Sequence, residues 1–178
     1  MSRRDTAAAA CAALMLAACA VAPPAPVGGD SLSGRLAVKV DGEGGAPPRS
    51  VSAAFELLGD PQRGRLNLST PLGSVLAQAR WAPGSVALVT PQGERQFADL
   101  DALTGEVLGE SLPVAALFDW LRGRPWPGAA SSASVPPAEP GFSQLGWVVS
   151  LARFDQAWVV ATRVAPPAVT VRAKLDRP

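Results

Sequence analysis

Short apolar runs that alternate with polar residues, and that are separated by tight turns, constrain the fold of this chain most. The last run is the clearest, because Val169, Val171, Ala173 and Leu175 alternate with polar or charged residues. A period of two places such apolar side chains on one face of a β-strand. Glycine and proline, with 17 and 18 residues, supply frequent turns between the runs. Strands joined by short turns must be antiparallel, so the pattern predicts an antiparallel meander.

Two helices are predicted within this β pattern. Asp99 suits an N-cap for a helix over 100–108 that stops at Gly109, and Pro113 suits the start of a second that ends at Gly123. The second helix has an apolar stripe that we expect to pack on the sheet, because it lacks the flanking lysines of a membrane-lying helix. A long loop is expected over 124–140. The predicted strands cover 33–40, 52–58, 65–69, 75–81, 86–90, 95–98, 142–151, 157–164 and 168–175.

The first nineteen residues indicate the compartment. Arg3 and Arg4 precede a short apolar run, and Leu16-Ala17-Ala18-Cys19 places small residues directly before a cysteine. The run is too short to span a bilayer and is typical of a secretory signal. The cysteine resembles the bacterial lipobox, whose thiol is diacylated before cleavage; an ordinary signal peptide with an incidental cysteine is the alternative. The expected divisions are 1–18, a signal peptide; 19–31, a lipidated N-terminus and flexible tether; and 32–178, one folded domain.

Lipidation of Cys19 would fix the mature protein to a membrane. Once residues 1–18 are removed, Cys19 is the one remaining cysteine, so no internal disulfide can form. Two or more acyl chains suffice for stable attachment. Ala20 follows the cysteine, whereas an aspartate there tends to mark inner-membrane retention in lipoproteins of this kind. The resemblance therefore implies the periplasmic face of the outer membrane.

The sequence offers no equipment for catalysis. It contains no histidine, the usual base of serine and cysteine triads. No glycine-rich phosphate loop or cluster of metal ligands is apparent, and helix capping explains Asp99 and Asp101 better than acid–base chemistry does. The 16 basic and 15 acidic residues give no electrostatic footprint for nucleic acid. We therefore predict no enzyme, no catalytic residues, no metal or other cofactor and no nucleic-acid partner.

The surplus of apolar residues leaves two interpretations of the interior. Five tryptophans, with many valines and leucines, are enough to fill a core completely, which is the default. A curved sheet with a helical lid would instead enclose an apolar cavity.

Four segments together resemble the LolB family, outer-membrane lipoproteins that receive and insert other lipoproteins in Gram-negative bacteria. The segments are Ser33-Gly34-Arg35-Leu36-Ala37-Val38, Leu68 through Ser74, Leu112 through Gly123, and Leu145 through Val149. With the lipobox they cover nearly the whole chain in order. The chain departs from the family at Leu57 and near Arg177 and Pro178, where members commonly carry tryptophans that would line or close a cavity.

The resemblance implies a mainly β fold, in which a bent antiparallel sheet forms an incomplete β-barrel with a few covering helices and an apolar cavity. The cavity would hold the acyl chains of passenger lipoproteins, taken from a LolA-like periplasmic carrier and inserted into outer-membrane lipid by a monomeric acceptor. A passenger carries dozens of methylenes, each costing roughly 0.8 kcal/mol in water, so it cannot travel uncovered. The candidate lining residues are Leu66, Leu68, Val75, Trp81, Leu117, Trp120 and Trp147.

Leu72 is the candidate membrane-insertion residue. Thr70-Pro71-Leu72-Gly73 suits a type I turn, which would place Leu72 at the tip between two strands. It matches the family's protruding leucine, although the tip could also fold back and bury it. Two rival functions stay open: a structural or assembly lipoprotein with a filled β-core that binds a protein partner, and a lipocalin-like carrier of a small apolar ligand.

Overall fold

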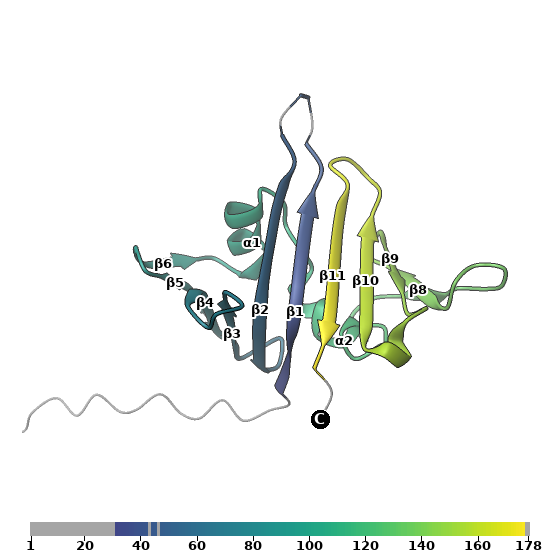
Figure 1. Cartoon of the computed structure of the whole chain (residues 1–178), viewed down its shortest axis with the longest axis horizontal. Coiled ribbons are helices and arrows are strands. Elements are labelled where there is room, and N and C mark those ends of the chain that lie inside the picture. The colour runs from purple at the N-terminus through teal and green to yellow at the C-terminus, as the bar shows by residue number, and fades with distance from the viewer. Residues whose placement is uncertain (1–30, 43, 46, 177–178) are drawn as a thin grey trace, which may run out of the picture.

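The computed structural model describes residues 31–42, 44–45 and 47–176. The predictions for the signal peptide, Cys19 and the tether lie outside these residues, apart from Ser31. Within them, eleven strands form one sheet (Figure 1). The strands are β1 Ser31–Val40, β2 Arg49–Gly59, β3 Gly64–Ser69, β4 Val75–Ala82, β5 Ser85–Thr90, β6 Gly93–Phe97, β7 Ser131–Ala133, β8 Gly141–Gln144, β9 Trp147–Ser150, β10 Trp158–Arg163 and β11 Val169–Leu175.

The sheet is antiparallel throughout and runs in the order β6-β5-β4-β3-β2-β1-β11-β10-β9-β8-β7. The chain starts at the centre with β1, meanders outward to β6, crosses to the other edge at β7, and returns to β11 beside β1. In the described part of the chain β6 and β7 do not pair, so the sheet stays open. These findings confirm the predicted mainly β fold with an unclosed barrel.

The two-residue period of the sequence sets the two faces of the sheet. In β1, Val38 is buried while Lys39 is exposed, and Val38 lies directly opposite Val51 of β2 and Val171 of β11. Apolar residues of neighbouring strands therefore stack on one face, which the helices cover. The other face carries polar and charged side chains.

Both predicted helices form in the crossover between β6 and β7. They are α1 (Leu100–Leu108) and α2 (Val114–Trp120), and Figure 1 shows them behind the central strands. Asp99 caps α1 as predicted, because its carboxylate accepts a hydrogen bond of 2.7 Å from the backbone N–H of Ala102. Gly109 ends α1 in the left-handed conformation. The 3-10 helix η1 (Phe154–Gln156) precedes β10. No helix of the described residues has the length and apolar character needed to cross a bilayer.

Two sequence predictions are wrong in this part of the fold. The strand expected over 142–151 is a hairpin, β8 and β9, because Leu145 and Gly146 both adopt positive φ values, 53° and 77°. Two such residues in succession form the tight turn that reverses an antiparallel pair. The expected loop over 124–140 contains the short edge strand β7, which pairs with β8.

Candidate functional site

An apolar cavity of about 340 Å³ lies between the sheet and the two helices. Its walls come from β1 to β5, from β11 and from both helices. Among the described residues that line it, only Thr90 and Thr104 have a polar side chain, and none is charged. A site of this composition offers almost nothing to a polar ligand and favours an apolar one.

One end of the cavity is closed and the other is open. Buried residues form the closed end, among them Leu57, Phe118 and Leu121. Partly exposed residues line the opposite end, among them Leu68, Thr90 and Val107, whose side chain is 47% exposed. We call this end the mouth. An apolar chain can enter at the mouth without any rearrangement of the closed end.

The interior has a filled half and a hollow half. Under β8 to β10, Trp120 packs on Trp147 and Phe142, with ring centroids 5.9 and 6.4 Å apart. Leucine, valine and alanine supply most of the cavity walls. Smaller side chains beneath a bent sheet leave volume that they cannot fill. The filled core that was the default interpretation is therefore wrong for the half formed by β1 to β5.

Three of the seven candidate cavity residues line the cavity: Leu66, Leu68 and Leu117. The structure places the three tryptophans elsewhere. Trp120 and Trp147 belong to the filled half. Trp81 packs edge-on against Phe118 at 5.8 Å, and its indole N–H donates to the carbonyl of Asp60 at 2.9 Å. These rings are buried, but as packing rather than as cavity wall.

Val75, the seventh candidate, is exposed and lies outside the cavity. Ala77 and Ala79 of the same strand do line it, as the alternation predicts. The register between β3 and β4 shifts after Leu68, so that Leu68 pairs with Ala77 but Ser69 pairs with Val75. The extra residue, Leu76, forms a β-bulge that breaks the alternation before it reaches Val75.

Several cavity residues escaped the sequence analysis. Leu103, Val107 and Leu108 of α1 form much of one wall, and Phe55 and Leu57 of β2 form part of another. The helical spacing of Leu103 and Val107, and the alternation in β2, carried a usable signal. Leu57 is one of the two positions where the chain departs from the family pattern, and its smaller side chain faces the cavity.

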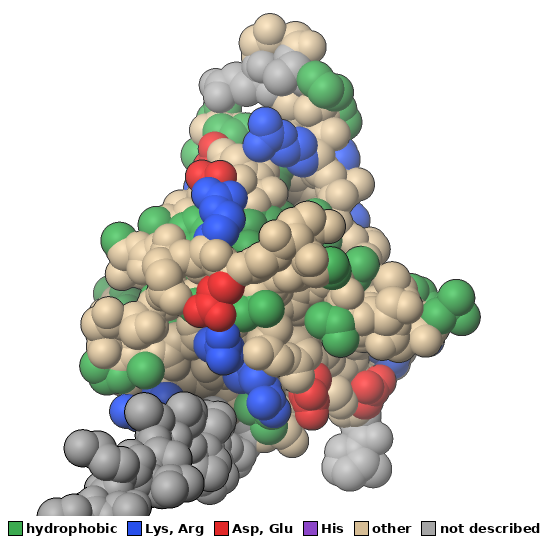
Figure 2. Space-filling view, turned by 90° about the vertical axis from the view of Figure 1, so that its left-hand side faces the viewer, with side chains coloured by type: hydrophobic (Ala, Val, Ile, Leu, Met, Phe, Trp, Pro, Cys, Tyr) green, Lys and Arg blue, Asp and Glu red, His purple; other side chains and the backbone are tan. Residues whose placement is uncertain are grey.

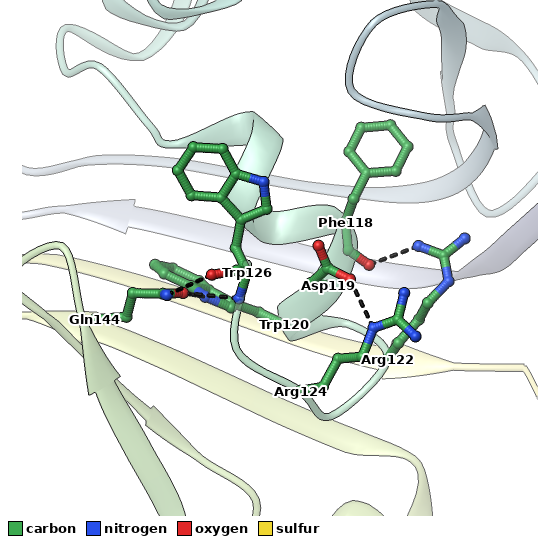
Figure 3. A network of polar contacts seen from close by, with 7 residues as sticks. All are labelled: Phe118, Asp119, Trp120, Arg122, Arg124, Trp126 and Gln144. Carbon is green, nitrogen blue, oxygen red and sulfur yellow. Dashed lines mark hydrogen bonds and ion pairs between the residues drawn. The ribbon is translucent and has the colours of Figure 1, made fainter. Parts of the chain in front are cut away.

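A buried amide holds the segment after α2 in place (Figure 3). The side chain of Gln144 accepts hydrogen bonds from the indole N–H of Trp120 at 2.8 Å and from the backbone N–H of Trp126 at 2.9 Å. It donates to the carbonyls of Trp126 and Ala129, both at 2.7 Å. All four hydrogen-bonding positions of the amide are used. The first part of the 124–140 segment is therefore fastened to the filled half of the core.

Ion pairs attach the other end of the crossover to the sheet. Glu106 of α1 pairs with Arg95 of β6 at 2.9 Å, and Glu110, just after α1, pairs with Arg163 of β10 at 2.6 Å. The second pair is mostly buried, so removal of either partner would leave a poorly solvated charge. Together these contacts hold α1 over the mouth of the cavity.

The described residues show no alternative chemical site. Burial, followed by the charge of neighbouring Asp99, raises the pKa of Asp101. Asp99 is occupied as the helix cap, so the two carboxylates do not form an acid–base pair. Among residues 31–42, 44–45 and 47–176 no group of three or more His, Cys, Asp or Glu side chains could hold a metal ion.

The turn between β3 and β4 presents Leu72 to solvent. The backbone N–H of Gly73 donates to the carbonyl of Thr70 at 2.9 Å, which closes the predicted turn. The side chain of Leu72 is 95% exposed, so the alternative in which the tip folds back is wrong. The turn lies at the mouth end, because β3 runs from Gly64 beside Trp81 toward Leu68 at the mouth.

Comparison with known proteins decides the family. The profile of the family described as "Outer membrane lipoprotein LolB" matches residues 31–176. The chain belongs to the LolB family. It is 35% identical to the outer-membrane lipoprotein LolB of Bordetella petrii, over 92% of this chain and 88% of that one. The LolB of Bordetella pertussis is 37% identical, over 79% of this chain and 74% of the relative. The LolB of Cupriavidus pinatubonensis is 32% identical, over 93% of this chain and 83% of the relative.

Membership in the LolB family confirms the resemblance first seen in four short segments. It also confirms the predicted location in the outer membrane, since the relatives are named as lipoproteins of that membrane. Their names describe no catalytic activity. In Figure 2, which faces the β3–β6 side of the molecule, exposed apolar side chains are scattered among basic and acidic ones.

Proposed function

We propose that this LolB-family protein receives lipoproteins at the outer membrane by binding their acyl chains in the cavity, and then delivers them to the bilayer. The observation that carries the proposal is a cavity beneath an open sheet, with no charge among the described residues that line it. Its volume of about 340 Å³ is near the lower end of the ~300–1,000 Å³ typical of ligand sites. Several acyl chains would therefore have to widen it.

The free-energy cost of exposing acyl chains to water makes a covered site necessary. Each acyl methylene costs roughly 0.8 kcal/mol in water, so several chains together cost tens of kcal/mol. We propose that a LolA-like carrier brings the passenger and that the two proteins meet mouth to mouth. No cofactor or energy source is needed if each successive site binds the chains more favourably, with the bilayer last.

Acylation of Cys19 would hold the protein at its target membrane. Residues 20–30 would then link the anchor to the start of β1. A fully extended chain of that length reaches roughly 40 Å, comparable with the roughly 33 Å of a ten-residue strand such as β1. The tether is therefore long enough for the mouth end to touch the same bilayer, and a monomer suffices.

Leu72 is then the residue that enters the bilayer. A leucine that is 95% exposed on a tight turn gains free energy only by meeting an apolar surface. At the mouth end, it would bring the bound acyl chains to the membrane. We propose that Leu72 starts the delivery step and plays no part in uptake.

A transfer assay tests the proposal. A loaded periplasmic carrier is mixed with the lipidated protein, and the movement of passenger is measured first onto the protein and then into vesicles. The proposal expects uptake that a fluorescent apolar probe inhibits competitively. Failure to take cargo from the carrier, together with no saturable probe binding, would favour a structural lipoprotein and overturn the proposal.

A further inference from the structure

The mouth end of the β3–β4 hairpin combines exposure, apolar character and absence of charge. Residues 66–79 contain no Asp, Glu, Lys or Arg. Beyond Leu72, the side chains of Val75 and Leu76 are 61% and 41% exposed. Adjacent exposed apolar residues on an uncharged hairpin differ from single apolar residues scattered on a surface, which need no explanation.

The β-bulge explains why these two neighbours are both exposed. Successive residues of a regular strand point to opposite faces, so one of the pair would normally face the cavity. Because Ser69 pairs with Val75 and Leu68 with Ala77, Leu76 has no partner in β3. The bulge therefore adds an apolar side chain to the outside of the hairpin.

Three backbone N–H groups of this turn already have hydrogen-bond partners within it. The N–H of Thr70 donates to the carbonyl of Ser74 at 2.9 Å, and that of Gly73 donates to the carbonyl of Thr70 at 2.9 Å. The N–H of Ser74 donates to the hydroxyl of Thr70 at 3.1 Å. These three donors are satisfied within the turn and need not be released from water when it enters lipid, which lowers the cost of such a move.

We propose that the bilayer contact is made by Leu72, Val75 and Leu76 together, a surface that we call the hairpin end. This inference rests on the proposed function and extends it from one residue to a surface. Val75 lies three residues beyond Leu72, at most roughly 10 Å along an extended chain. Leu76 lies one residue further, at most roughly 13 Å, and the turn at Gly73 shortens both distances. Apolar faces of interfacial segments enter the membrane by about 5–10 Å, so the proposed contact includes all three side chains.

The hairpin end also connects the membrane with the cavity. Ala77 follows Leu76 directly, and it pairs with Leu68; both line the cavity near its mouth. An acyl chain that leaves the mouth would therefore pass along apolar side chains from Ala77 to Leu76 and Val75. Immersion of the hairpin end closes the gap between cavity and bilayer.

Site-specific labelling tests this contact directly. In the full lipidated protein, Leu72→Cys, Val75→Cys and Leu76→Cys variants are labelled with an environment-sensitive fluorophore and reconstituted into vesicles containing brominated lipid. We expect quenching at all three positions, and none at a Val148→Cys control, whose valine is exposed on β9. Quenching at Leu72 alone would overturn the larger surface and leave the insertion role of Leu72 standing. Absence of quenching at all three would overturn both.

A functional comparison separates contact from transfer. We expect the double substitution Val75→Ser with Leu76→Ser to slow delivery into vesicles about tenfold while uptake from the carrier is unchanged. The matched control is Val148→Ser with Val164→Ser, because both valines are exposed elsewhere on the described surface. Delivery at the wild-type rate by the Val75–Leu76 variant would overturn the inference, as would an equal loss in the control.

Discussion

Replacement of Gln144 by leucine should destabilise the protein more than any change at its surface. Gln144 is 2% exposed, and its amide makes four hydrogen bonds of 2.7 to 2.9 Å. Leucine has a similar size but can make none of them, so two donors and two carbonyls lose their partner. Each buried polar group left without a partner costs about 1–3 kcal/mol, with the lower figure for groups that water can still reach.

The free energy of unfolding should fall by about 4 kcal/mol in total. Trp120 is fully buried and contributes most, whereas the backbone groups of Trp126 and Ala129 lie nearer to solvent and contribute less. Such a loss is a large part of the ~5–15 kcal/mol that stabilises a typical domain. At about 2–4 °C per kcal/mol, the Tm should fall by roughly 8–16 °C.

Urea and thermal unfolding, followed by tryptophan fluorescence and circular dichroism, measure this change. Gln96→Leu is the matched control, since that amide is exposed and donates only to Glu94. We expect the control to stay within about 0.5 kcal/mol of the wild type. A Gln144→Leu variant that unfolds within about 1 kcal/mol of the wild type would refute the view that this amide holds the 126–129 segment.

Three further substitutions test the delivery step, the cavity and the cap of α1. Leu72→Glu should leave folding and uptake intact but abolish delivery to vesicles, because a carboxylate at the tip opposes entry into lipid; normal delivery would contradict the assigned role. Ala79→Phe should fill the closed end of the cavity and weaken binding of an apolar fluorescent probe at least tenfold in titrations. Overpacking by the larger side chain should lower the free energy of unfolding by about 1–3 kcal/mol. Asp99→Ala should remove the cap of α1 and lower the free energy of unfolding by about 1 kcal/mol, whereas Asp99→Asn should retain most of it in the same denaturation experiment.

Sequence patterns predicted the parts of this fold that local rules control. The alternation in β1 and β11, the Asp99 cap and the turn at Leu72 each depend on residues close in sequence. The cavity depends instead on how much space remains between two distant surfaces. Alternation shows that Trp147 faces inward, but whether it fills the core or lines a void depends on the rings opposite it.

Two departures from local rules could not be predicted for the same reason. Leu145-Gly146 lacks the Asn or Asp that usually marks a two-residue hairpin turn, so one strand was expected where two occur. The bulge at Leu76 follows from a change of register between β3 and β4, which no pattern in β4 alone reveals. That single inserted residue moved Val75 from the expected cavity wall to the exposed hairpin end.

Photolabelling by the passenger itself tests most directly whether its acyl chains occupy the cavity. A lipoprotein whose acyl chains carry a diazirine is transferred from the carrier to the lipidated protein and irradiated, and the modified peptides are identified by mass spectrometry. Binding in the cavity predicts adducts on residues such as Leu66, Leu68 and Leu117, and none on Phe142 or Trp147 in the filled half. Adducts confined to the filled half or to the polar face of the sheet would contradict it.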